Sequence, residues 1–212
     1  KYRPFTVKEE KILLMAQESK DFDQMITSIK QIINNCIDNI DVDSLAMFDL
    51  EYMLINIRAQ SVDNMLEFKI KDPDTEEEVE LQINIRDIKI NTPEDHNKNI
   101  TINDGAFIVM RYPSLEELSI LYAGRDKSDT AKAFNIMINC IDSIVNNDEV
   151  YKLKDYSEDE INEFVDGLNG STLKSIEKFF RTMPKLRHEI KYTNKNDVEK
   201  TFVIEGTESF FI

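Results

Sequence analysis

The side chains of this chain best suited to chemistry are two histidines and two cysteines. Nucleophilic catalysis needs a base held beside a nucleophile. His96 lies in a polar stretch, and His188 stands between Arg187 and Glu189 on an expected strand, so both histidines are predicted to be surface residues. Two well-separated cysteines cannot form a structural zinc cage, which uses about four ligands in closely spaced pairs. The sequence therefore predicts no catalytic residues, no metal and no cofactor.

Both cysteines stand in the same phrase, Asn-Cys-Ile-Asp, which starts at Asn35 and again at Asn139. Isoleucines follow each cysteine at helical spacing, which predicts that Cys36 and Cys140 fill space in packed helices. A buried free thiol is the usual state of such a residue in a reducing compartment. A disulfide between Cys36 and Cys140 is the less favoured alternative.

Acidic side chains are abundant but are not arranged as a known metal site. The run from Asp72 to Glu78 lacks the central Gly and terminal Glu of a calcium loop, so it is predicted to be a solvated hairpin turn. Asp38, Asp41 and Asp43 could together hold a divalent ion, which keeps a metal-dependent hydrolase as a minor alternative. With only 5 Gly, no phosphate-binding loop is recognisable.

Charge and hydropathy restrict the surroundings in which the chain works. A net charge of -15 and a pI near 4.6 disfavour nucleic acid and anionic membranes as partners. No apolar run approaches the roughly 20 residues of a membrane helix. We therefore expect a soluble intracellular protein. The sequence starts at Lys1 rather than Met, which leaves the content of any preceding segment unknown.

Hydrophobic periodicity predicts an α+β protein. Apolar residues spaced by three and four predict helices, and alternation with period two predicts hairpins and short strands. Three expected helices follow caps at Thr6, Ser114 and Ser157, and further helices are expected at 25–40, 45–59, 134–144 and 176–183. The expected hairpins cover 65–85 and 186–204. Short strands are expected at 88–90, 100–102 and 107–110.

The order of these elements indicates an internal duplication. Capping boxes open helices at Thr6 to Glu9 and at Ser114 to Glu117, and each is followed by the Asn-Cys-Ile-Asp phrase and later by a hairpin. We therefore expect two pseudo-repeated lobes, each a small helical bundle followed by a β-hairpin. The predicted domains are residues 1–104 and 105–212, the second with an aromatic C-terminal tail.

Aromatic residues near both ends of the sequence are the best candidates for contacts with a partner. The tail with Phe210 and Phe211 is expected either to cover a lobe interface or to dock on a partner, because exposed aromatic rings are costly in water. The segment from Tyr2 to Phe5 is either an extended arm or a staple for the first helix. The candidate interaction residues are Tyr2, Arg3, Phe5, Phe179, Phe180, Phe210 and Phe211.

Three stretches of the sequence are distinctive: Arg3-Pro4-Phe5-Thr6-Val7-Lys8-Glu9-Glu10-Lys11, Phe48 to Tyr52 with Ile57 to Ser61, and Lys178-Phe179-Phe180 with Pro184. With these stretches, the chain resembles the baseplate hub and hub-assembly proteins of T-even-type tailed bacteriophages. The resemblance spans nearly the whole chain, and its most specific part is the first of these stretches. Some relatives carry Cys pairs at the two hairpins, where this chain has Asp72-Pro73-Asp74 and Thr193-Asn194-Lys195, so the resemblance implies no metal-stabilised hairpin here.

The resemblance implies a non-enzymatic virion protein of the tail baseplate, assembled in the host cytoplasm. Its expected partners are other baseplate hub and tail proteins, or further copies of itself, with neither nucleic acid nor membrane. The leading hypothesis is a structural hub component. The alternative is a transient, chaperone-like hub-assembly factor that is absent from the finished virion.

Overall fold

The computed structural model of the chain describes residues 1–19, 21–61, 64–123 and 130–205. The chain forms two compact units. The first unit contains Lys1–Asn91 and Pro184–Ile212, and the second contains Thr92–Met183. Helices and antiparallel sheets occur together, which confirms the predicted α+β class.

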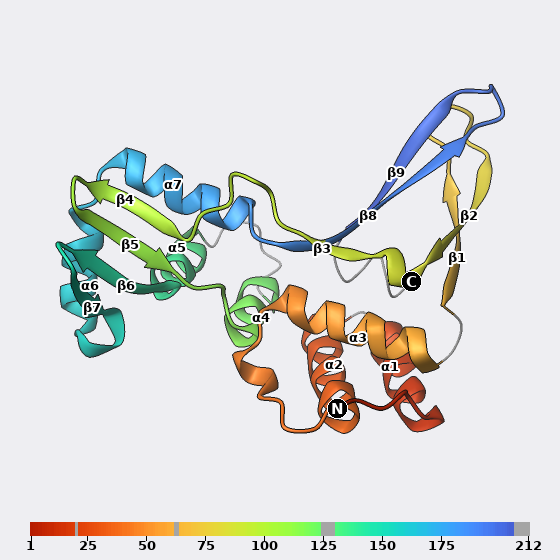
Figure 1. Cartoon of the computed structure of the whole chain (residues 1–212), viewed down its shortest axis with the longest axis horizontal. Helices are drawn as coiled ribbons and strands as arrows, with labels where there is room; N and C mark the ends of the chain where they lie inside the picture. The colour runs from red at the N-terminus through yellow and green to blue at the C-terminus, as the bar shows by residue number, and fades with distance from the viewer. Residues whose placement is uncertain (20, 62–63, 124–129, 206–212) are drawn as a thin grey trace. The chain divides into compact units, whose positions relative to one another are not determined.

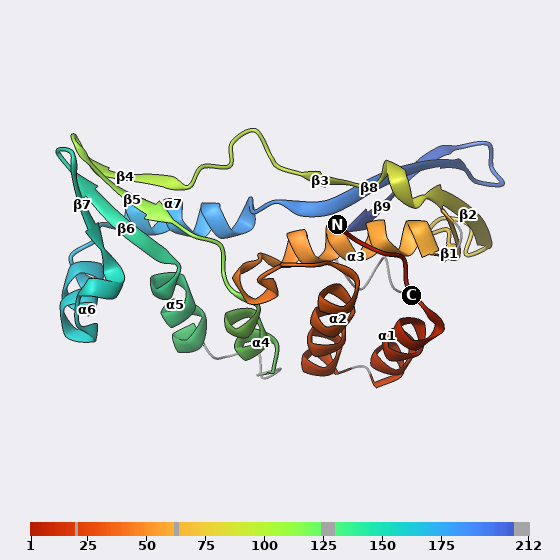
Figure 2. The same ribbon diagram turned by 60° about the horizontal axis from the view of Figure 1, so that its bottom comes forward.

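Three helices form the bundle of the first unit: α1 (Val7–Ser19), α2 (Phe22–Cys36) and α3 (Met47–Ser61). The 3-10 turn η1 (Val42–Ser44) precedes α3. Figure 2 shows α3 lying across α1 and α2. The residues spaced by three and four along α2 are buried, as the sequence predicts, and pack with those of α3. The fully buried members are Ile29, Ile32, Ile33, Leu50, Leu54 and Ile57.

Two hairpins complete the first unit and lie side by side (Figure 1). Strand β1 (Met65–Lys71) pairs with β2 (Glu78–Asn84), and β8 (Lys185–Thr193) pairs with β9 (Glu199–Glu205). Both hairpins confirm the period-two alternation of the sequence. The turn η2 (Ile85–Asp87) leads to β3 (Lys89–Asn91), which adds to the outer edge of β8.

The turn of the first hairpin departs from the expected solvated loop at one residue. Asp72 is only 1% exposed. Its carboxylate accepts hydrogen bonds from the backbone N–H of Asp74 at 3.0 Å and of Thr75 at 2.9 Å, and from the Tyr192 hydroxyl at 2.8 Å. The last bond joins the two hairpins, and the Phe68 and Phe202 rings, 5.8 Å apart, pack between them. A buried carboxylate is tolerated here because these donors replace water.

The second unit is a four-stranded antiparallel sheet covered by helices. The strands lie in the order β4 (Asn99–Asn103), β5 (Ala106–Met110), β6 (Ile141–Asn146) and β7 (Glu149–Lys152). Helices α5 (Thr130–Asn139), α6 (Glu158–Asp166) and α7 (Gly170–Arg181) share one hydrophobic core with one face of the sheet (Figure 2). Helix α4 (Leu115–Ala123) and the 3-10 turn η3 (Leu153–Asp155) complete the unit.

The prediction of one helix through residues 134–144 is wrong. Helix α5 ends at Asn139, and Ile141 begins β6. Spacings of three between Ile138, Ile141 and Ile144 fit a helix, but the β-branched run after Cys140 also suits a strand when a partner is available. Strand β5 supplies that partner, which a local periodicity cannot reveal. In the same way α2 ends at Cys36, short of the predicted Ile40, and Ile37 is extended.

The compact units do not follow the order of the sequence. The strands β8 and β9 return to the first unit after the chain has built the second. The predicted division into residues 1–104 and 105–212 was a division into two sequence repeats, not into compact units. The internal duplication itself stays a prediction.

Candidate interaction sites

An arginine latch, formed by Arg3, Thr6 and Glu9, fixes the start of α1. The Glu9 carboxylate is 2% exposed and accepts from the Arg3 guanidinium at 2.9 and 3.3 Å and from the Thr6 backbone N–H at 2.8 Å. The Arg3 backbone N–H donates to the carbonyl of Cys36 at 2.8 Å. This first latch therefore joins the segment that enters α1 to the end of α2, and it includes one half of the predicted capping box, the bond from the Thr6 backbone N–H to the Glu9 carboxylate.

A second latch with the same residue types and spacing lies at the start of α4. The Arg111 guanidinium donates to Glu117 at 2.7 and 2.8 Å and to the carbonyl of Asn139 at 2.6 Å. The Ser114 backbone N–H donates to Glu117 at 2.7 Å, and the Arg111 backbone N–H donates to the carbonyl of Cys140 at 2.8 Å. Each latch thus ties an Arg-x-x-Ser/Thr-x-x-Glu segment to the carbonyl of one of the two cysteines.

Both latches shift the pKa of their carboxylates downward. Hydrogen bonds from Arg3 and then Thr6 lower the pKa of Glu9 to about 2, against an opposing contribution from burial. For Glu117, burial raises the pKa, but the bonds from Arg111 and Ser114 together outweigh it and leave the pKa lowered. Both carboxylates are therefore ionised acceptors at neutral pH.

The cysteines beside the latches are buried free thiols, as predicted. Burial is the main cause that raises the pKa of Cys36 and takes that of Cys140 to about 12. A thiol with so high a pKa is protonated at neutral pH and is a poor nucleophile. Both residues therefore serve packing.

The N-terminal candidate residues are partly occupied by contacts within the first unit. Tyr2 is half exposed, pairs with Ile37 in an isolated bridge, and accepts a hydrogen bond from Gln60 at 2.7 Å through its hydroxyl. Arg3 is held by the first latch. The backbone N–H of Phe5 donates to the Ser61 hydroxyl. The segment from Tyr2 to Phe5 is thus anchored to the bundle, and its role in partner binding stays a prediction.

The C-terminal aromatic candidates are in different environments. Phe179 is 1% exposed and belongs to the core of the second unit, and the partly buried Phe180 packs edge-on against it with ring centroids 5.1 Å apart. Phe210 and Phe211 lie outside the described residues. Any contact of Phe179 with a partner would require the core to open.

His96 is not the solvated residue that the sequence predicts. Its ring is partly buried, its Nδ1 lies 3.0 Å from the Thr182 hydroxyl, and its Nε2 lies 3.0 Å from the Tyr112 hydroxyl. It also stacks on Phe179 with ring centroids 5.2 Å apart. Burial, followed by the charge of Lys98, lowers its pKa. His96 therefore closes a packed aromatic cluster, and nothing in its local sequence signals these distant partners. His188 does lie on a strand, β8, as predicted.

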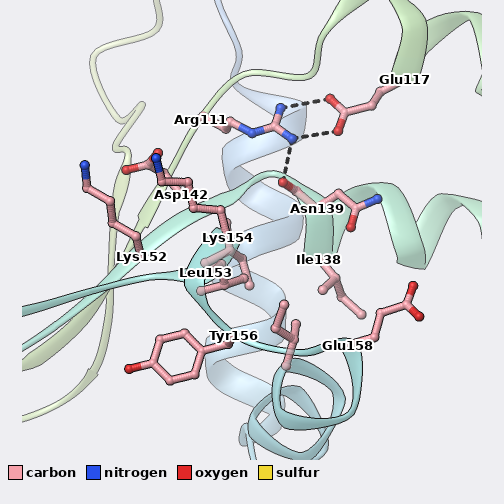
Figure 3. Close-up of a pocket in the computed structure, with 12 residues that line it drawn as sticks. Arg111, Glu117, Ile138, Asn139, Asp142, Lys152, Leu153, Lys154, Tyr156 and Glu158 are labelled. Carbon is pink, nitrogen blue, oxygen red and sulfur yellow. Dashed lines mark hydrogen bonds and ion pairs between the residues drawn. The ribbon is translucent and has the colours of Figure 1, made fainter.

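A pocket of about 450 Å³ opens beside the second latch (Figure 3). Figure 3 shows Arg111 and Glu117 at one end and Tyr156 at the other, with the side chains of Lys152 and Asp142 along one side. Its twelve lining residues include no His, Cys or Ser. The pocket therefore has both charges and apolar surface for binding.

The clearest exposed apolar surface of the first unit lies on α1. Val7, Leu14 and Met15 are 68%, 54% and 70% exposed and recur at spacings of seven and eight, so they share one side of the helix. We call these three residues the outer face of α1. The opposite side packs Leu13 and Ala16 into the bundle. Large apolar side chains gathered on an exposed helix face are typical of interaction surfaces.

Within the described ranges, no group of three or more His, Cys, Asp or Glu side chains is placed to hold a metal ion. Asp43, one of the three acidic residues weighed for such a site, pairs instead with Lys30 at 2.7 Å. None of the described helices combines the length and the apolar character needed to cross a membrane.

Comparison with known proteins identifies the family. The family described as "T4 bacteriophage base plate protein" matches residues 1–212, the whole of the sequence. Neither the curated proteins nor the solved structures gave a match. The resemblance that starts at Arg3-Pro4-Phe5 is thereby confirmed at the level of the family. The chain belongs to the T4 bacteriophage base plate protein family.

Proposed function

We propose that the chain is a structural component of the baseplate hub of a contractile-tailed bacteriophage. The observation that carries this proposal is the family match over all 212 residues. In this proposal the protein is not an enzyme, is assembled in the host cytoplasm, and binds other hub proteins rather than nucleic acid or membrane. A transient hub-assembly factor is the competing role, and presence in the finished particle separates the two.

The outer face of α1 is the surface that we propose for contact with a hub partner. Its three side chains have little contact with the bundle, because the same helix buries Leu13 and Ala16 on its other side. Burying exposed apolar side chains contributes about 25 cal/mol per Å². Interfaces commonly concentrate their binding energy in a few such side chains at the centre.

Replacing Leu14 and Met15 together by aspartate is expected to abolish incorporation of the protein into hub complexes. The free energy of unfolding should change by less than about 1 kcal/mol, because both side chains are exposed. Complementation of a phage that lacks the gene, followed by isolation of hub complexes, measures the effect. Lys174→Asp, at an exposed position of α7 in the second unit, is the control and should assemble normally. Normal assembly of the double variant would remove α1 from the proposed interface.

A further inference from the structure

Strand β4 is an edge of its sheet and carries no charged residue between Asn99 and Asn103. It reads Asn99-Ile100-Thr101-Ile102-Asn103, and it pairs with β5 on one side only. The opposite edge, β7, starts with Glu149 and ends with Lys152. Native proteins usually protect an exposed edge with charges, because unpaired N–H and C=O groups recruit another strand. The edge of β4 thus has the character of a pairing surface.

The hydrogen bonding of β4 fixes which backbone groups point away from the sheet. The Met110 N–H donates to the carbonyl of Lys98 at 2.8 Å, so Lys98 and then Ile100 bond toward β5 in the β4–β5 register. Asn99 and Thr101 therefore point their N–H and C=O outward. The Asn99 N–H is occupied by the side chain of Asn97 at 2.9 Å. Within the described residues, the outward groups of Thr101 have no hydrogen-bond partner.

A bulge limits how far this edge extends. The register of β4 against β5 shifts between Thr101 and Asn103, so the outward alternation stops after Thr101. An added antiparallel strand can then use the outward C=O of Asn99 and the outward N–H and C=O of Thr101, while the Asn99 N–H stays bonded to the Asn97 side chain. Two copies of the same edge satisfy this condition, because Asn99 of each copy can lie opposite Thr101 of the other.

The charges that flank β4 favour a second copy as the occupant. Lys98 precedes the uncharged strand and Asp104 follows it. An antiparallel arrangement about a two-fold axis turns the Lys98 end of each copy toward the Asp104 end of the other. The Lys98 ammonium of each copy also lies over its own Tyr112 ring, 4.1 Å from the ring centroid. Each end of the paired edge then carries two unlike charges.

We propose that two copies of this protein pair antiparallel through their β4 edges, with Asn99 opposite Thr101 of the second copy, to form one continuous sheet. The paired edge is short, so its buried area lies below the roughly 1,000 Å² of a stable interface and the pairing is weak at low concentration. A baseplate that holds copies close together would strengthen it by raising the effective concentration. The inference does not depend on the proposed hub role, since it concerns only the contact between copies.

Disulfide trapping with two variants that each gain one cysteine, N99C and T101C, tests this register. In the proposed pair their Cα atoms lie about 5.5 Å apart, within the range of a disulfide. Two copies of the same variant would face each other diagonally at about 8 to 9 Å, which is too far. We expect an equimolar mixture of differently tagged N99C and T101C to form linked heterodimers at least about tenfold faster than either variant alone forms homodimers. Cys36 and Cys140 stay in place, because both are buried.

A mixture of V150C and K152C on the opposite edge is the matched control and should link no faster than either variant alone. Linking of N99C with T101C at the control rate would overturn the proposal. A second measurement uses T101P, which removes an outward N–H and keeps the bonds to β5. Sedimentation should show concentration-dependent self-association of the unmodified protein and of T101V, and its loss in T101P. Equal association of all three proteins would also overturn the proposal.

Discussion

Replacing Phe179 by alanine is expected to lower the free energy of unfolding of the second unit by about 3 to 5 kcal/mol. Its ring is 1% exposed and packs against His96, Tyr112 and Phe180 with centroid distances of 5.2, 5.6 and 5.1 Å. The substitution leaves a cavity where helix α7 meets the sheet, and it removes the ring on which His96 stacks. Urea denaturation followed by far-UV circular dichroism measures the loss.

Phe180→Ala is the matched control for this prediction. Phe180 is the next residue of α7 and is only partly buried, so its replacement should cost less than half as much. A hub-binding defect in Phe179→Ala without loss of stability would instead indicate that Phe179 acts at an interface. Equal stability losses for the two variants would contradict the described packing of α7.

Glu9→Ala is expected to destabilise the first unit by about 1 to 3 kcal/mol, because the Glu9 side chain is buried while the Arg3 side chain is 44% exposed and can be solvated. The change removes a buried acceptor and leaves the Arg3 guanidinium and the Thr6 N–H without their partner. The contact between the N-terminal segment and the end of α2 should loosen as a result. Amide hydrogen exchange should show faster exchange at the Arg3 and Thr6 amides, together with a lower midpoint of urea unfolding.

Glu10→Ala is the control, because Glu10 is the exposed neighbour on the same helix and should change stability by less than about 0.5 kcal/mol. The pH dependence provides a second readout. Folding lowers the pKa of Glu9 from 4.5 to about 2, so the unfolded state binds the proton more readily. Its contribution to stability is present above pH 4.5 and is lost as the pH falls toward 2. Between pH 4.5 and 2, the free energy of unfolding of Glu9→Ala should therefore fall less steeply than that of the unmodified protein. Equal slopes of the free energy of unfolding against pH would contradict the latch.

The sequence predicted the elements with strong local patterns. Charged residues alternate with Leu66, Phe68 and Ile70. This alternation was sufficient to predict the first hairpin, because one face of the hairpin is buried and the other is solvated. The capping box at Ser114 was also recognisable, since its contacts lie within four residues. Local physics determines both features.

Features that depend on distant partners could not be predicted in this way. Ile141 and Ile144 are strand residues because β5 and β7 flank them, and the return of β8 and β9 to the first unit depends on long-range pairing with β3. His96 is buried by Tyr112, Phe179 and Thr182, which the sequence places far away. Arg3 and Arg111 were missed as latch residues, although both stand three positions before a capping Thr or Ser and six before a Glu. That repeated spacing was the available signal.

We propose that this chain remains in the finished baseplate as a structural component. Quantitative mass spectrometry of purified tails, with peptides from an established tail protein as the internal standard, can measure whether it does. A structural component should be present at a fixed stoichiometric number of copies per tail that persists through repeated purification. Absence from tails, together with presence in isolated hub intermediates, would contradict the structural role and establish the transient assembly factor.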